Sequence, residues 1–403
     1  MAIMQGSPAA VQPSCGVGHP VFRQEGMFMR LMHLADLHIG KRLNEFPLLD
    51  DQSYILDEIL RIAEEQKPDA VAIAGDIYDK STPSAEAVAL FDSFISRLAK
   101  LVTPVFVISG NHDSAERIAF GSSLMQTAGV YLSPVYNGES SPVKVKDEFG
   151  SVNVYMLPFI RPSDVRRRFP DDDTESFDSA FKTAVTHLDV NENERNIILA
   201  HQFITGAAAG GSESVSVGGL DNISSEVFEP FDYAALGHIH HRQNITSEKV
   251  RYCGTPLKYS FSEVNDKKTV TIANIGKKGE LSIEEIPLCP IRDLREIKGT
   301  YLEITDRNFY SKFNCEDYIH VTLTDENDIP EAIGRLRAVY PNIMKLDYDN
   351  TRTRENRVVN DLADEVQRSP AELFAEFYRT CNNSELSEEQ KDYIDGVIKE
   401  IFD

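Results

Sequence analysis

The sequence has few cysteines and no long apolar run, and each absence excludes a class of protein. No stretch reaches the length of about 18 apolar residues that a membrane-spanning helix needs, so we expect no membrane partner. The five cysteines are odd in number, widely spaced and free of any C-x-x-C pair. Neither a disulfide framework nor a zinc ribbon is therefore indicated, and a reducing, cytoplasmic compartment is expected.

The sequence also lacks an excess of positive charge. Its formal net charge is −23, which repels a polyanion, so any contact with nucleic acid must come from local groups rather than from a general basic field. Lys41, Arg42 and Arg242 are the candidates, because each stands beside one of the polar motifs described below. The alternative for each is an ordinary solvated surface charge.

The chain is long enough to bury a substantial core. With 403 residues, of which 41% are hydrophobic and 26% charged, it has the composition of a soluble protein with two or three domains. Residues 1–26 are rich in Gly, Pro and Ser and lack the apolar core of a signal peptide, while Met27 and Met29 precede the first expected strand. We interpret residues 1–26 as a disordered extension or a cloning remnant.

Five short polar clusters follow five apolar runs. Each apolar run predicts a buried strand, so every cluster leaves the sheet at a strand's carboxyl end, and all five can meet at one site. Asp, His and Asn side chains suit hard to borderline divalent ions, and no cysteine lies among them. Turn chemistry is the alternative for any one cluster, but five together predict a metal centre. The clusters are residues 35–38, 75–79, 110–113, 200–202 and 237–240, and the runs are residues 31–35, 70–74, 105–108, 197–200 and 233–236.

Strands and helices alternate in the first half of the chain, which predicts an α/β class. Helices are expected at residues 54–66, 84–100 and 115–128, and the strand at 70–75 is apolar throughout, as in a sheet covered on both faces. Hairpins are expected between 130 and 159. The small polar stretch 206–219 follows a cluster and predicts a mobile loop near the site or a plain surface loop.

The last part of the chain shows a different pattern of expected secondary structure. Residues 291–349 predict short strands and one helix at 331–340, a small α+β unit. A charged linker at 350–368 leads to two amphipathic helices, the second of which has Ser387 and Gln390 in a capping box. Their apolar stripes need a partner, although folding back onto their own domain is the alternative.

The ordered motifs carry a family resemblance. The series D-x-H, G-D-x-x-D, G-N-H-D, H and G-H-x-H resembles the calcineurin-like metallophosphoesterases, and the strings HLADLHIGK, GDIYD, SGNHDS and ALGHIH resemble their DNA-repair branch, above all the SbcD family. A weaker likeness continues through residues 251–263. The resemblance implies a four-layer β-sandwich flanked by helices at 27–288 and a DNA-contacting capping domain at 289–349. It also implies that residues 350–403 dock on an SbcC-like ATPase, within a nucleoid-associated complex in which the chain is a homodimer.

The chemistry of a phosphodiester suggests why such a site holds two ions. Attack on this anion needs charge neutralisation and an ionised water near neutral pH, and two ions about 3.5 to 4 Å apart supply both. By resemblance, Asp76 bridges the ions, with Mn²⁺ expected and iron or zinc also compatible with these ligands. The resemblance assigns the first ion to Asp36, His38 and His240, and the second to Asn111, His201 and His238.

Two further residues are expected to act in catalysis. In the family's G-N-H motif the histidine, here His112, faces the phosphate and aids leaving-group protonation or transition-state stabilisation. Asp79 resembles the aspartate that orients this histidine in protein phosphatases. A metal-dependent DNA nuclease, exonuclease on duplex ends and endonuclease on hairpins or single strands, is the favoured function. A small-molecule phosphodiesterase or phosphatase and a non-catalytic scaffold for DNA or an ATPase are the alternatives.

Overall fold

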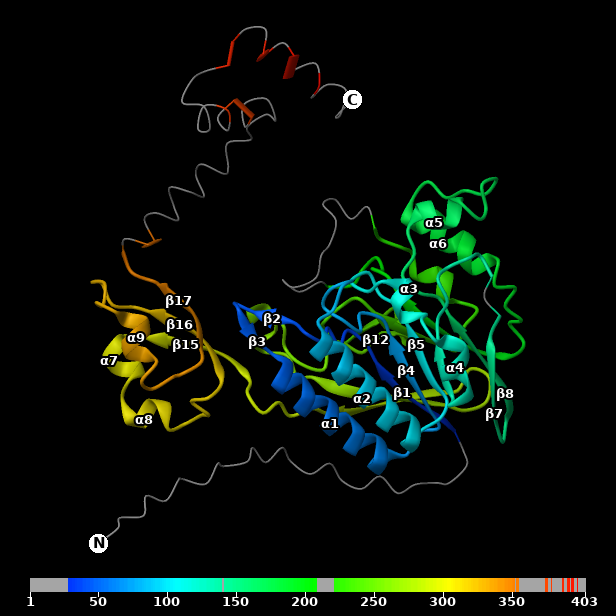
Figure 1. The fold of residues 1–403 in the computed structure, drawn as a ribbon, viewed down its shortest axis with the longest axis horizontal. Coiled ribbons are helices and arrows are strands. Elements are labelled where there is room, and N and C mark those ends of the chain that lie inside the picture. The colour runs from blue at the N-terminus through cyan, green and yellow to red at the C-terminus, as the bar shows by residue number, and fades with distance from the viewer. Residues whose placement is uncertain are drawn as a thin grey trace.

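Figure 1 shows the computed structural model of the chain, which describes residues 28–139, 141–208, 221–351, 353–354 and separate positions between 374 and 397. Two six-stranded sheets pack against each other through an apolar layer, and helices cover the outer face of each sheet. Helix, sheet, sheet and helix thus form four layers. The predicted four-layer α/β sandwich is confirmed.

The first sheet contains four parallel strands extended by two antiparallel ones. Helices α1 (Leu49–Gln66) and α2 (Ala85–Leu101) pack on its outer face. Both helices lie across this sheet in Figure 1. The strand order is β14 (Leu281–Pro287), β13 (Thr269–Ile275), β1 (Met29–Leu34), β4 (Ala70–Ala74), β5 (Val105–Ile108) and β6 (Val130–Leu132).

The second sheet has four parallel strands at its centre and an antiparallel strand at each edge. Its outer face is covered by α5 (Pro162–Arg166), α6 (Phe177–Thr186) and the 3-10 helix η1 (Ser225–Phe228). The strand order is β11 (Gln243–Ile245), β12 (Ser247–Tyr252), β10 (Tyr233–Gly237), β9 (Arg195–His201), β8 (Gly150–Met156) and β7 (Val143–Asp147).

The position of strand β4 explains why its sequence is apolar throughout. Val71 and Ile73 face the helices α1 and α2, whereas Ala70, Ala72 and Ala74 face the second sheet. A strand between two buried layers has no solvent face, so it shows no polar alternation. The small alanine side chains let the two sheets approach closely at this strand.

Two predicted helices differ from those in the structure. The helix expected at 115–128 is broken into α3 (Ala115–Ile118) and α4 (Ser122–Thr127), because Gly121 has a left-handed φ of 73° that interrupts the helical path. Helix α1 begins five residues before the expected start at Tyr54. Its first turn carries two buried polar side chains, Asp51 and Gln52. They interrupt the periodic pattern of apolar residues from which the start of the helix was predicted.

The smaller unit that follows the sandwich is built on a three-stranded parallel sheet, β15 (Leu294–Gly299), β16 (Tyr318–Leu323) and β17 (Ile343–Tyr348). Its connections carry α7 (Tyr301–Ile304), α8 (Arg307–Tyr310) and α9 (Ala332–Leu336). The unit is therefore α/β, and the expected α+β character is wrong. Helices α7 and α8 have only four residues each, too few to produce a helical period in the sequence.

Several expectations fall outside the described residues. The loop at 206–219 is described only to residue 208, and the linker at 350–368 only in its first residues. In the second C-terminal helix, the Ser387 and Gln390 backbone N–H groups donate to each other's side chains at 2.9 and 3.3 Å, which confirms this capping box. Within the described residues no helix is both long and apolar enough to cross a bilayer. Cys253 and Cys315 are free thiols.

Candidate metal centre

The five polar clusters follow β1, β4, β5, β9 and β10, and the structure brings their side chains together at the carboxyl edges of the two sheets. Three overlapping groups have ligand atoms within 4.8 Å of one another, and every member except His112 is buried. The groups are Asp36 with His38 and His240, Asp36 with Asp76 and His201, and His38 with Asp76 and His112.

The backbone at the site is turned sharply. Four residues have positive φ angles, a region that residues other than glycine seldom occupy. They are Asp36 at 53°, His38 at 45°, Asp76 at 48° and His238 at 102°. Each such residue costs on the order of 1–3 kcal/mol and persists only where the surrounding structure holds it. Four of the seven predicted ligands therefore sit on strained backbone, as is common at functional sites.

Three glycines allow the sheets to meet. A Cβ atom on Gly237 would lie 1.9 Å from the carbonyl oxygen of Ala74, and one on Gly75 would lie 2.4 Å from Nδ1 of His201. Gly110 is equally restricted, since its Cβ would lie 2.2 Å from Oδ1 of Asp76. The glycines in the motifs therefore leave room for the neighbouring ligands.

The first ligand group contains two facing imidazoles. Nε2 of His38 lies 3.1 Å from Nε2 of His240, while Nδ1 of His240 faces a carboxylate oxygen of Glu263 at 3.4 Å. The carboxylate favours the proton on Nδ1 of His240, so Nε2 presents its lone pair. Nδ1 of His38 is buried without a hydrogen-bond partner. This nitrogen lies 3.9 Å from a carboxylate oxygen of Asp79. The two converging imidazoles suit a site built around a cation.

The second ligand group converges on an amide oxygen. Nδ1 of His201 must donate to the carbonyl oxygen of Ala74, at 2.8 Å, because a carbonyl only accepts. Nε2 of His201 is the nitrogen left for a metal ion, and it lies 3.0 Å from Oδ1 of Asn111. Nδ1 of His238 lies 2.9 Å from the same oxygen. These nitrogen and oxygen donors fit a divalent ion of borderline softness.

Asp76 lies between the two groups. Its Oδ2 is 3.6 Å from Nε2 of His38 and 3.4 Å from Nε2 of His201, and its Oδ1 accepts from the backbone N–H of His112 at 2.9 Å. Burial opposes ionisation, but the neighbouring His201 holds the pKa of the Asp76 carboxyl well below its usual range. The carboxylate is thus charged and placed to face both groups.

The histidines differ in protonation. Burial lowers the pKa of His238 to about 3 and holds the pKa of His38 well below its usual value, so both are neutral near pH 7. Burial also disfavours charge on His201, but the attraction of Asp76 and Asp36 dominates and raises its pKa to about 9. The negative potential that attracts this proton would equally attract a metal ion.

His112 and Asp79 interact, but through the backbone of Asp79. Nδ1 of His112 donates to the carbonyl oxygen of Asp79 at 3.0 Å, which leaves Nε2 as the other functional nitrogen of His112. The Asp79 carboxylate instead accepts from Nζ of Lys41 at 2.8 Å. The prediction that Asp79 orients His112 is therefore corrected in its chemistry, because the contact to His112 comes from the main chain.

Sequence reasoning missed three supporting residues. Glu263 contacts His240 and belongs to the stretch of weaker likeness at 251–263, which is the signal that could have identified it. Gln52 donates to the carbonyl oxygen of His38 at 2.7 Å, and only its polar character in a helix hints at this role. Asp113 accepts from the backbone N–H groups of Ile77, Tyr78 and Gly110 at 2.9–3.0 Å, which ties two motif loops together.

The three predicted DNA contacts are each engaged within the chain. Lys41 pairs with Asp79, and Arg42 donates to the carbonyl oxygen of Glu45. Arg242 donates to the carbonyl oxygen of Lys267 at 2.7 Å and lies 3.3 Å from Glu285. Lys41 is therefore the one of the three that the structure ties directly to the metal motifs.

Comparisons with known proteins agree with this geometry. The family model described as calcineurin-like phosphoesterase matches residues 29–242, and the model described as type 5 capsule protein repressor C-terminal domain, SbcD_C, matches residues 290–382. A curated relative, the SbcD chain of the nuclease SbcCD of Staphylococcus epidermidis, is 32% identical over 382 residues, which are 93% of this chain and 99% of the relative.

Solved structures are similar at lower identity. GAP50, the anchor in the inner membrane complex of Plasmodium, is 11% identical, with a TM-score of 0.39 over 81% of this chain and 98% of its own. A dimetal phosphatase from Danio rerio is 12% identical, with a TM-score of 0.40 over 65% of this chain and 96% of its own. On the family models and the curated relative, the chain belongs to the calcineurin-like phosphoesterases and, within them, to the SbcD family of metal-dependent nucleases.

Proposed function

We propose that seven side chains hold two divalent ions and that the chain uses this centre to hydrolyse phosphodiester bonds in DNA. The observation that carries the proposal is Oδ2 of Asp76, which lies within 3.6 Å of a ligand nitrogen from each group. One carboxylate between two sets of nitrogen and oxygen donors is the arrangement that two-metal hydrolases require. The proposed ligands are Asp36, His38, Asp76, Asn111, His201, His238 and His240, and the proposed ions are Mn²⁺.

The chain's own groups would divide the remaining work. When bound, the ions supply charge neutralisation at the phosphodiester and lower the pKa of an attacking water. His112 keeps Nδ1 bonded to the carbonyl oxygen of Asp79, so Nε2 is the nitrogen available to a phosphate oxygen or the leaving group. Lys41, held by Asp79, adds a positive charge beside this histidine. Lys41 is our leading candidate for a DNA phosphate contact, ahead of Arg42 and Arg242.

We also propose an SbcC-like ATPase as the partner of the C-terminal helices, in a cytoplasmic, nucleoid-associated complex. The curated relative is named as one chain of the nuclease SbcCD, which supports this assignment. The described residues of this segment line an apolar pocket of about 270 Å³, and the Tyr393 side chain is largely exposed. The lining residues are Phe374, Tyr378, Leu386, Gln390, Tyr393 and Ile394. On this proposal residues 27–288 cleave, 289–349 cap the site and contact DNA, and 350–403 dock the ATPase.

A homodimer is proposed from a separate apolar surface. Phe120, between α3 and α4, and Leu124, on α4, expose 86% and 78% of their surface. Two large apolar side chains at such exposure, four residues apart in the chain, favour contact with another protein surface. The two residues lie on the segment that follows His112, so a second copy of the chain would pack beside the metal centre. A double variant, Phe120→Glu with Leu124→Glu, should shift the mass measured by light scattering to that of a monomer.

A cleavage panel tests the proposed function. The purified chain is incubated with Mn²⁺ and linear duplex DNA, hairpin DNA, single-stranded DNA or bis(p-nitrophenyl) phosphate, with and without the SbcC-like ATPase. We expect cleavage of the DNA substrates that is abolished by EDTA and enhanced on duplex ends by the ATPase. Hydrolysis of the small ester alone would identify a small-molecule phosphodiesterase. DNA binding without any hydrolysis would identify a scaffold.

A further inference from the structure

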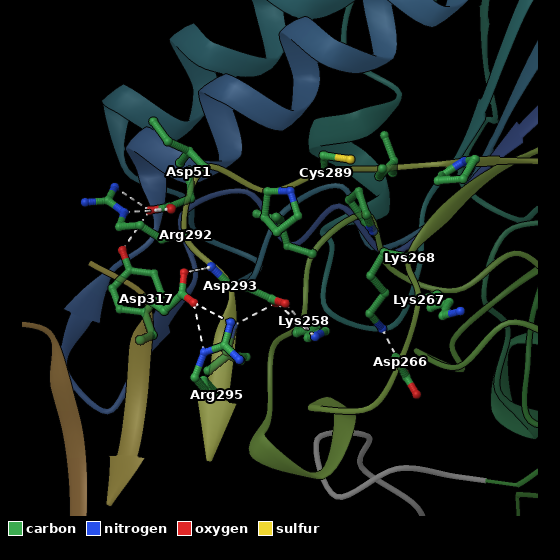
Figure 2. Close-up of a pocket in the computed structure, with 18 of the residues that line it drawn as sticks. Asp51, Lys258, Asp266, Lys267, Lys268, Cys289, Arg292, Asp293, Arg295 and Asp317 are labelled. Atoms are coloured by element: carbon green, nitrogen blue, oxygen red, sulfur yellow. Dashed lines mark hydrogen bonds and ion pairs between the residues drawn. The ribbon is translucent and has the colours of Figure 1, made fainter. Parts of the chain in front are cut away.

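The smaller unit contacts the sandwich through a buried carboxylate on α1. Asp51 is 2% exposed and accepts from Nε and Nη2 of Arg292 at 2.9 and 2.7 Å, and from the hydroxyl of Tyr318 at 2.7 Å. Figure 2 shows Asp51 facing Arg292 across this junction. A bidentate arginine and a tyrosine on one buried carboxylate form a directional contact, which we call the Asp51 clamp.

The residue after Asp51 holds the first ligand loop. The side chain of Gln52 donates to the carbonyl oxygen of His38 at 2.7 Å, and its Oε1 accepts from the backbone N–H of Gly40 at 2.9 Å. It also donates to the hydroxyl of Tyr259 at 3.1 Å, and Tyr259 packs edge-on against the His38 ring. A shift of the first turn of α1 therefore moves both the clamp and the support of His38.

A second route joins the smaller unit to the other imidazole of the same ligand group. His320 on β16 packs against the ring of Phe261, with ring centroids 5.3 Å apart. Phe261 begins the 3-10 helix η2 (Phe261–Glu263), whose last residue, Glu263, contacts Nδ1 of His240. Thus His38 and His240 are both supported by elements that the smaller unit touches.

The second ligand group is supported differently. Its histidine His201 donates to the carbonyl oxygen of Ala74, within the sandwich, and its Asn111 follows β5. A cavity of about 580 Å³ is lined by residues of both units, among them Asp51 and Leu257 of the sandwich and Leu294 of the smaller unit. The two units are also joined by the ion pair of Lys258 with Asp293 at 2.9 Å and by Leu294 and Tyr318, which pack into the core of the sandwich. The clamp and the Phe261 contact are the parts of the junction that lead to the supports of His38 and His240.

We propose that the smaller unit is a positioning device for one of the two ions: its docking on Asp51 and Phe261 sets the orientation of His38 and His240. Asp51, Gln52 and Arg292 are positioning residues, because each acts on the ligands through another group. The inference rests on the proposed two-ion site. It predicts that disturbing the junction weakens the binding of one ion and spares that of the other, because among the described residues the contacts from the smaller unit lead to supports of the first ligand group.

The test is a Mn²⁺ titration of the metal-free full-length chain by isothermal calorimetry. Arg292→Gln opens the clamp, and Arg295→Gln is the matched control, since Arg295 pairs at 2.9 Å with Asp317 inside the smaller unit. Loss of an outer partner of a metal ligand costs about 10–100-fold in affinity. We expect a loss of about 10-fold at one of the two sites in Arg292→Gln, and affinities near wild type in Arg295→Gln.

A double variant separates positioning from a general loss of structure. Gln52→Leu should weaken the same site, and combining it with Arg292→Gln should add little, because both changes act through the same support. Should Arg292→Gln fail to fold in a thermal melt, Tyr318→Phe, which removes only one hydroxyl, is judged by the same criterion. Equal affinities in clamp and control variants, an equal loss at both sites, or fully additive losses would each overturn the inference.

The titration and the cleavage panel can fail separately. A wild-type chain that binds two Mn²⁺ ions but leaves every phosphodiester intact contradicts the proposed nuclease function, while the pattern of site affinities still decides the positioning role. DNA cleavage by wild type together with equal affinities in Arg292→Gln and Arg295→Gln leaves the nuclease function standing and rejects the positioning role.

Discussion

Oδ2 of Asp76 lies 3.6 Å from Nε2 of His38, and it faces the other ligand group at a similar distance, 3.4 Å from Nε2 of His201. Asp36 also belongs to two of the candidate ligand groups, but among the described residues Asp76 is the carboxylate that accepts the backbone N–H of His112. The account of the centre therefore depends on Asp76 more than on any other side chain.

The substitution Asp76→Ala should remove both ions and abolish hydrolysis, because one bridging carboxylate serves two sites. The metal content of the purified variant, measured by inductively coupled plasma mass spectrometry, checks this. Asp57→Ala, which removes an exposed carboxylate from α1, is the control and should keep two ions per chain. Retention of two ions by Asp76→Ala would show that Asp76 is not the bridge.

His112→Ala should keep its ions while hydrolysis falls by about 10²-fold or more, the scale expected for losing a proton donor or a charge stabiliser. The reason is geometric, since Nδ1 of His112 is already bonded to the carbonyl oxygen of Asp79. Metal content and the single-turnover rate are measured on the same preparation. Ions lost in parallel with the rate would make His112 a ligand instead.

The sequence was sufficient to predict those candidate metal ligands that directly follow a strand. Apolar runs followed by Asp36, Asp76 and Asn111 are local patterns, and the strands they predicted are present. The supports could not be predicted in this way. Gln52 and Glu263 reach the site from other elements, and their contacts with His38 and His240 depend on how α1 and η2 pack, which no local period encodes.

The same limit explains the errors in the fold. The break between α3 and α4 depends on the backbone of Gly121, since a single glycine in an otherwise helical pattern does not by itself end a helix. The parallel order of β15, β16 and β17 depends on the connections between them. The helices in these connections are too short to produce a helical repeat of apolar residues in the sequence. Asp79 was correctly placed near His112, but which atom makes the contact is a tertiary detail.

Gly237→Ala should destabilise the sandwich by about 3 kcal/mol or more, because its Cβ would lie 1.9 Å from the carbonyl oxygen of Ala74, and overpacked cores lose on this scale. Urea unfolding of the metal-free protein measures the change. Gly334→Ala is the control, because no atom lies within 4 Å of its added Cβ, and it should be neutral or slightly stabilising. Equal stabilities of the two variants would contradict the close approach of the sheets.

His33 should make the stability of the sandwich fall with acid. Its ring lies between the sheets, bonded to the hydroxyl of Tyr233 at 2.8 Å and the carbonyl oxygen of Leu236 at 3.1 Å. Burial lowers its pKa from 6.5 to about 3, so the unfolded chain takes up the proton first as pH falls below 6.5. The contribution of His33 is complete above pH 6.5 and is lost progressively between pH 6.5 and about 3.

Between pH 6.5 and 5, this group alone should cost about 2 kcal/mol of unfolding free energy. His33→Gln can keep a donor and an acceptor but has no charge to gain, so it should lose less stability than wild type over the same interval. Urea unfolding of both metal-free proteins at the two pH values gives the difference, in which the other histidines cancel. Parallel losses in the two proteins would contradict a neutral buried His33.

A truncated chain tests the docking segment. The cut belongs after Arg354, because Arg354 pairs with Asp349 at 2.8 Å and Asn350 is buried, so both belong to the smaller unit. The truncated protein should keep its fold and its metal-dependent cleavage of single-stranded DNA, while it loses association with the SbcC-like ATPase and ATP-stimulated digestion of duplex ends. Undiminished co-purification with that ATPase would place the docking surface elsewhere.

The central claim is that two ions share one carboxylate at the junction of the two sheets. Crystals of the wild-type chain loaded with Mn²⁺, measured at the manganese absorption edge, locate the ions directly by anomalous scattering. We predict two peaks per chain on either side of Oδ2 of Asp76, one between His38 and His240 and the other between His201 and His238. A single peak, or peaks that do not touch Asp76, would contradict the account.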